Sequence, residues 1–273
     1  MATDPLSPAE ALVLLDPRKG QSRAALKLTL TGLLMQGVLR LEESEEKGLF
    51  GRTKKVTRLR VSPDAPAVPP PAASVVEVVR AAEAKGGKLD ELALQARKAY
   101  GTDLSGFQKS HVVPALVARG LVEERRERML GLIPVRRLYH TAAGEAEKSR
   151  LETLIAEARN IPDYLSRDLG RAAAVAAALG GALLLVDELR PFYGRISEAL
   201  RGADPNAFGD YDFWSRDVPS LSSGSFDLAS FDPAALDGLD TSLAALDTSF
   251  DASFDSGSSD GGGDSGGGGS GGD

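Results

Sequence analysis

The stretch RGLVEERRERMLGLIPVRRLY, residues 119–139, decides how the chain is interpreted, because it joins a glycine turn, two charged segments and an apolar tip. Gly120 predicts a helix end, and a turn between two charged segments predicts a β-hairpin. Two interpretations of the tip stay open: it packs into the domain core, or it contacts a partner or a membrane surface. The arginines that frame the tip are Arg125, Arg126, Arg128, Arg136 and Arg137, and its apolar residues are Met129, Leu130, Leu132 and Ile133.

Formal charge divides the chain into two parts. Residues 203–273 contain fourteen Asp, no Glu, one Arg and no Lys, which gives a charge of −13, whereas the whole chain carries −7. Residues 1–202 therefore carry +6. A basic body favours anionic partners such as phosphates, nucleic acid or acidic lipid. A tail that only keeps the protein soluble is the alternative explanation for its acidity.

The body, residues 1–202, is predicted to be mainly α: a helical domain with two β-hairpins in winged-helix-like helix–hairpin units. Short segments at about 38–42 and 56–61 predict the first hairpin, and a Pro-rich spacer is expected at 62–73. Apolar periodicity and end signals predict helices at about 8–15, 23–36, 74–84, 90–100, 106–119, 143–159, 172–186 and 191–200.

The C-terminal residues 203–273 are predicted to form a disordered tail. Ser-Phe-Asp occurs in it four times, and ten of the seventeen residues from Gly257 onward are Gly. Such a sequence buries too little apolar area to offset the entropy lost on ordering. We expect the tail to bind a protein partner or to compete with anionic ligands for the basic body.

Two segments of the body are alike. They are TGLLMQGVLRLEE followed by GLFGRTKKVTRL, and PALVARGLVEERRERMLGLIPVRRL. Both have the order helix, glycine, strand, turn and basic strand. An internal duplication of a helix–hairpin unit and a chance similarity both account for this pattern.

The sequence contains no motif of the enzyme classes considered. It has no Cys, which excludes disulfides, thiol chemistry and Cys-ligated zinc, and His111 and His140 are its two histidines. A nucleophile elbow, a Walker loop and a dinucleotide-binding glycine motif are missing. We therefore expect a non-enzymatic protein without cofactor or metal. The N-terminal MATDPLSPAE lacks the pattern of a secretory signal, so the expected location is cytoplasmic.

Taken in order, several pieces of residues 5–203 resemble the Golgi phosphoprotein 3 family, whose members also occur in bacteria. These pieces are LSPAEALVLL, then GLLMQGVLRLEE with KKVTRLRVSPDAP, then VVPALVARGLVEERRERMLGLIPVRRL. The Ala-rich segment 172–186 fits a late buried helix of that family. The tail is not part of the resemblance.

The resemblance implies a peripheral membrane domain that binds phosphatidylinositol 4-phosphate at the cytoplasmic face of a membrane. The family's headgroup pocket uses an aromatic residue and several arginines. Here the expected Trp is missing, and the matching region offers Arg23, Lys27 and Lys109. A Lys holds a phosphate as a point charge, without the bidentate fork of Arg. These three residues and the five hairpin arginines form the predicted headgroup site for an anionic phospholipid or phosphoinositide, and the tip is the predicted membrane contact.

Two other classes compete with this lipid-binding module. A winged-helix nucleic-acid binder would use residues 106–119 as its recognition helix. That helix offers only Lys109, His111 and Arg119 for phosphate and base contacts, so the sequence favours lipid over nucleic acid. A scaffold would instead recruit proteins through its body and tail, and the charged hairpin at 43–60 is a candidate surface for a homo-oligomer.

Overall fold

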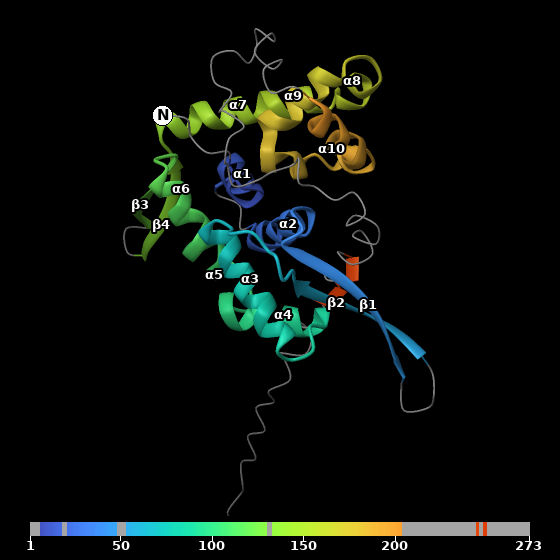
Figure 1. The fold of residues 1–273 in the computed structure, drawn as a ribbon. Coiled ribbons are helices and arrows are strands. Elements are labelled where there is room, and N and C mark those ends of the chain that lie inside the picture. The colour runs from blue at the N-terminus through green and yellow to red at the C-terminus, as the bar shows by residue number, and fades with distance from the viewer. Residues whose placement is uncertain are drawn as a thin grey trace, which may run out of the picture.

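The computed structural model describes residues 6–17, 21–47, 53–129, 133–203, 244–245 and 248–249. These residues form a mainly helical body with two antiparallel β-hairpins, which confirms the predicted fold class (Figure 1). The elements are α1 (Pro8–Leu15), α2 (Ser22–Met35), β1 (Leu39–Lys47), β2 (Thr53–Val61), α3 (Pro70–Glu83), α4 (Leu89–Tyr100), α5 (Ser105–Phe107), the π-helix η1 (Gln108–Val112), α6 (Val113–Ala118), β3 (Val122–Met129), β4 (Ile133–His140), α7 (Ala142–Ala158), α8 (Ile161–Arg167), α9 (Leu169–Leu179), the 3-10 helices η2 (Gly180–Leu185) and η3 (Asp187–Phe192), and α10 (Tyr193–Gly202).

Helix α2 lies at the centre of the body. It packs against α1, α3, α5, η1 and η2. Its apolar residues recur at helical spacing, and Leu26, Leu30 and Leu33 are almost completely buried. Helix α1, which packs on it, begins with the expected capping box, in which Ser7 and Glu10 each accept a hydrogen bond from the other's backbone N–H.

The late Ala-rich segment is divided at Gly180-Gly181, a pair that the sequence marks as a close-packing point or a break within 172–186. Instead of one helix over 172–186, α9 ends at Leu179, and η2 continues as a 3-10 helix. Gly180 ends α9 with a φ of 51°, a backbone conformation that side chains with a Cβ rarely adopt. A Cβ on Gly181 would lie 2.6 Å from Cδ of Pro8, so this glycine lets η2 pack closely on the start of α1.

Proline positions correct two boundaries. The predicted spacer 62–73 ends at Pro69, because Pro70 and Pro71 occupy the first turn of α3, where a helix requires no N–H donor. The predicted helix 106–119 is divided into α5, η1 and α6. Pro114 lies in the first turn of α6 and follows the π-helical turn, in agreement with the irregularity expected there. Helix α8 has no counterpart among the predicted elements.

The two helix–hairpin units share the same backbone hydrogen bonds at their bases, and duplication and chance similarity both stay open as the origin of this likeness. In both units a glycine with φ near 70° ends the helix in a Schellman motif, and a hydroxyl after the hairpin donates to that glycine's carbonyl. In the first unit, N–H groups of Gly37, Val38 and Ser62 donate to the carbonyls of Leu34, Leu33 and Val38, and Ser62 Oγ donates to Gly37 O. In the second, N–H groups of Gly120, Leu121 and Thr141 donate to Val117, Leu116 and Leu121, and Thr141 Oγ1 donates to Gly120 O.

The helix after each hairpin packs on a helix outside its own helix–hairpin unit. Helix α3, which follows the first hairpin, packs on α4, and α7, which follows the second hairpin, packs on α1. The hairpins project on opposite sides of the helical body (Figure 1). A β-bridge between Arg58 and Lys88 adds a short third segment to the outer edge of β2. Of the predicted tail, the described residues 244–245 and 248–249 are helical, and the predicted disorder of the rest lies outside the described residues.

Candidate functional site

Three of the five arginines of the β3–β4 hairpin pair with glutamates of the same hairpin. Arg125 pairs with Glu123, Arg136 with Glu124 at 3.5 Å, and Arg137 with Glu127 at 3.4 Å. All three arginine side chains are more than half exposed, so each ion pair contributes at most about 1 kcal/mol of stability. This pairing lowers the positive charge that the sequence suggested for the hairpin. Arg126 is also exposed, and the backbone of Arg128 lies opposite Pro134.

The apolar tip is outside the part of the chain that the structure describes. Leu130, Gly131 and Leu132 are not described, and for Met129 and Ile133 the structure gives the backbone pairing without the side chains. The choice between a core tip and a membrane-contacting tip therefore stays open.

A second basic group lies where α2 meets η1. Ser22 Oγ, at the start of α2, donates a buried hydrogen bond of 3.0 Å to Gln108 Oε1, the first residue of η1. This bond joins residues 86 positions apart and brings Arg23 and Lys109 onto adjoining element ends. Lys27 lies one turn after Arg23 on the same side of α2. Of the predicted headgroup residues, Arg23 and Lys109 therefore follow directly on the two bonded residues, and Lys27 lies on the same helix as Arg23. We call this group the α2–η1 junction.

The start of α2 has features that an anion site requires. Its N-cap residue, Gln21, makes no side-chain capping hydrogen bond, so the first-turn N–H groups of a 14-residue helix are not capped by a side chain. The Gln21 Oε1 atom is buried and has no hydrogen-bond partner within the described residues. Lys109 is exposed, and its Nζ donates to Ser105 Oγ at 3.0 Å. The junction thus combines cationic side chains, a helix N-terminus and one buried acceptor.

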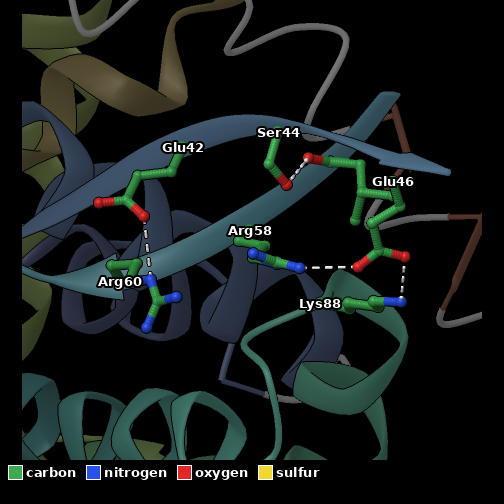
Figure 2. A network of polar contacts seen from close by, with 7 residues as sticks. Glu42, Ser44, Glu46, Arg58, Arg60 and Lys88 are labelled. Carbon is green, nitrogen blue, oxygen red and sulfur yellow. Dashed lines mark hydrogen bonds and ion pairs between the residues drawn. The ribbon is translucent and has the colours of Figure 1, made fainter. Parts of the chain in front are cut away.

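The first hairpin carries a different polar network, which ties it to the loop before α4 (Figure 2). Glu46 accepts from Arg58 and from Lys88, both at 2.7 Å, and a further pair joins Arg60 to Glu42 at 3.0 Å. The Lys88 hydrogen bond, followed by that of Arg58, lowers the pKa of Glu46 below its ordinary value of 4.5. The homo-oligomer expected through residues 43–60 stays a prediction.

The helix expected to recognise nucleic acid offers few cations. His111 packs in an edge-on contact with Tyr100 and near Phe107, and burial lowers its pKa below the ordinary 6.5, which favours the neutral ring. Arg119 contacts the buried Glu10 at 3.4 Å. Lys109 is then the exposed cation of this segment, and one cation is too few for a helix that binds the nucleic-acid backbone.

Sequence reasoning missed Gln21, Ser22, Gln108 and Lys88. These residues are polar and lie at element ends, where no apolar periodicity marks them. The uncapped start of α2 was a usable signal, because Gln21 is a poor N-cap residue.

Within the described ranges, no helix is both long and apolar enough to cross a membrane, and no cluster of His, Asp and Glu has the grouping of a metal site. Comparison with known proteins finds no matching family model and no matching curated protein. The resemblance to the Golgi phosphoprotein 3 family therefore stays a prediction from the sequence.

Proposed function

We propose that this protein is a non-enzymatic module that binds the phosphorylated headgroup of an anionic phospholipid at the α2–η1 junction. The observation that carries the proposal is the buried Ser22–Gln108 hydrogen bond, because it brings two distant basic segments to one place. Arg23, Lys27 and Lys109 supply positive charge, and the N-terminus of α2 adds a partial positive charge from its peptide dipoles.

A phosphoinositide suits this junction better than a plain phosphate does. Its phosphates are anionic acceptors, which the basic side chains and helix N–H groups complement. Its ring hydroxyls are donors, and the buried Oε1 of Gln21 is an acceptor without a partner in the described residues. A ligand that carries both kinds of group would satisfy both sides of the junction.

The hairpin β3–β4 takes a secondary part in this proposal. Three of its five arginines are already paired with Glu123, Glu124 and Glu127, so an acidic membrane surface has to compete with those carboxylates. We therefore expect the hairpin to add long-range, salt-sensitive attraction, and the junction to provide headgroup selectivity.

Vesicle sedimentation with the full-length protein tests the proposal. Vesicles of phosphatidylcholine alone, with phosphatidylserine, and with phosphatidylinositol 4-phosphate separate general charge attraction from headgroup recognition. The double variant Lys27→Ala/Lys109→Ala should lose about 2 kcal/mol of binding free energy, roughly 30-fold in affinity, if each cation contributes about 1 kcal/mol.

The matched control is Lys98→Ala/Arg159→Ala, which removes two exposed cations from α4 and from the end of α7. It should reduce binding only slightly. Equal losses in both double variants would mean that the junction is not a site and that net charge alone drives binding. A larger loss in Arg126→Ala/Arg136→Ala would move the headgroup site to the hairpin.

A further inference from the structure

The acidic tail makes a specific contact with the body. Thr248 Oγ1 donates to Ala244 O at 2.9 Å, a spacing of four residues that belongs to a helical turn. The next residue, Ser249, donates from Oγ to Oδ1 of Asp90 at 2.7 Å. Asp90 lies 159 residues earlier in the chain, in the first turn of α4. This contact is on α4, and not on the arginine-rich hairpin that charge alone would have suggested.

The loop that presents Asp90 is held firmly by the first hairpin. Leu59 N–H donates to Gly87 O at 2.9 Å, and the β-bridge joins Arg58 to Lys88. The Lys88 side chain also reaches Glu46 (Figure 2). A short segment that docks here therefore meets a surface that is already ordered, which lowers the entropic cost of docking.

The charges at this place are mixed. Lys85 pairs with Glu91 at 3.2 Å and Lys88 pairs with Glu46 at 2.7 Å, and the first turn of α4 combines N–H groups that no side chain caps with the carboxylates of Asp90 and Glu91. The tail carries −13. Asp90 itself would repel an acidic segment unless that segment presents a donor at the right position. The hydroxyl of Ser249 is such a donor, so Asp90 fixes the register of the docked turn.

We propose that the start of α4, with Asp90 as the acceptor, is an intramolecular docking site for Thr248 and Ser249 of this chain's own tail. The sequence Leu-Asp-Thr-Ser at 246–249 also occurs seven positions earlier, at 239–242, so the tail holds two copies of the motif for one site. Docking through Ser249 keeps the acidic tail close to the body and leaves the copy at 239–242 undocked. This inference does not depend on lipid binding.

The absence of Cys allows a direct test in the full-length chain. A nitroxide attached to Ala245→Cys should selectively broaden the amide signals of residues 89–92 in isotope-labelled protein. Ser249→Ala removes the donor without touching the body, and Asp90→Ala removes the acceptor; each should reduce the broadening at α4 roughly fivefold, as loss of one hydrogen bond predicts. The matched controls are Ser253→Ala in the next repeat and Asp64→Ala on an exposed loop, which should leave it unchanged.

Three outcomes would overturn the proposal. The first is broadening spread evenly over the body, and the second is an equal effect of Asp90→Ala and Asp64→Ala. The third comes from mixing spin-labelled, isotopically silent protein with unlabelled, isotope-enriched protein: broadening at residues 89–92 in that mixture would make a second copy the occupant. Selective broadening that is lost in Ser249→Ala and absent from the mixture supports docking of the chain's own tail.

Discussion

The two hairpins share a base and differ in how the rest of each is attached. At the base, the Schellman glycine and the hydroxyl that closes the loop are the same in β1–β2 and β3–β4. Beyond the base, β1–β2 is joined to the α3–α4 loop through Glu46 and Lys88. The Arg–Glu pairs of β3–β4 join residues of that hairpin, and its links to the body are at its end, where His140 Nδ1 lies 3.0 Å from Glu145 Oε1 of α7 and His140 Nε2 lies 2.6 Å from Leu14 O.

This difference shows how a repeated unit can take two roles. A carboxylate that joins two elements, as Glu46 does, cannot exchange its partners without loosening the structure. Arginines that pair only with neighbouring glutamates can exchange them for an outside anion at little structural cost. The first hairpin is therefore a structural support for the start of α4, and the second is the hairpin that is suited to an external partner.

The largest expected effect concerns the end of the second hairpin. A Cβ on Gly144, in the first turn of α7, would lie 1.8 Å from the carbonyl oxygen of Leu121, a contact that only a backbone shift could relieve. Gly144→Ala should lower the free energy of unfolding by about 3 kcal/mol, and the thermal midpoint by roughly 6–12 °C. The first hairpin has Ala65 at the corresponding distance after its closing hydroxyl, so the constraint belongs to the second unit alone.

The control for this change is Gly202→Ala, where a Cβ meets nothing within 4 Å. It should leave the midpoint nearly unchanged in the same calorimetric scan. A Gly144→Ala protein as stable as this control would mean that α7 can move away from β3. The bases of the two hairpins would then tolerate an added side chain equally well.

A smaller difference is expected between the two closing hydroxyls. Thr141 Oγ1 donates to Gly120 O and also accepts from Gly144 N at 3.0 Å, so it closes the hairpin and caps α7. Ser62 Oγ donates to Gly37 O, and α3 begins only at Pro70. Thr141→Ala should cost about 1–2 kcal/mol because a cap is lost, and Ser62→Ala about 0.5–1 kcal/mol. Chemical denaturation of both variants gives the comparison, and equal costs would show that the cap contributes nothing.

The sequence predicted what depends on short-range pattern. Apolar spacing located α2, α4 and α7 to within one or two residues, and Gly37 and Gly120 marked the ends of their helices because a positive φ leaves a residue-type signal. The strands were predicted too short. Charged residues at 43–47 and 53–55 look like a loop, yet they continue the ladder, in which the backbone of Glu45 lies opposite Lys55 and that of Glu46 opposite Lys54.

Contacts between distant polar residues could not be predicted from the sequence. Nothing local marks Ser22 and Gln108 as partners, or Lys88 as an addition to β2. The family resemblance suggested Arg23, Lys27 and Lys109. Only the packing of α2 against η1, through the Ser22–Gln108 bond, relates the two segments that carry them. Counting arginines alone also overestimated the positive charge of the β3–β4 hairpin, because three of them pair with its glutamates.

The smallest expected effect tests whether Glu46 supports the start of α4. Because Lys88 and then Arg58 lower the pKa of Glu46, the folded chain favours its ionised form. That stabilisation is fully present above the unfolded value of 4.5 and is lost as the pH falls through the lower folded value. The Leu59 N–H donates to Gly87 O in the loop before α4. At neutral pH, Glu46→Gln should therefore reduce the amide-exchange protection of Leu59. The difference in protection at Leu59 between wild type and variant should vanish as the pH drops below 4.5.

Glu124→Gln, in the other hairpin, is the control and should leave protection at Leu59 unchanged. A gap that persists in acid would mean that the network is not electrostatic in origin, and that the β-bridge alone holds the loop.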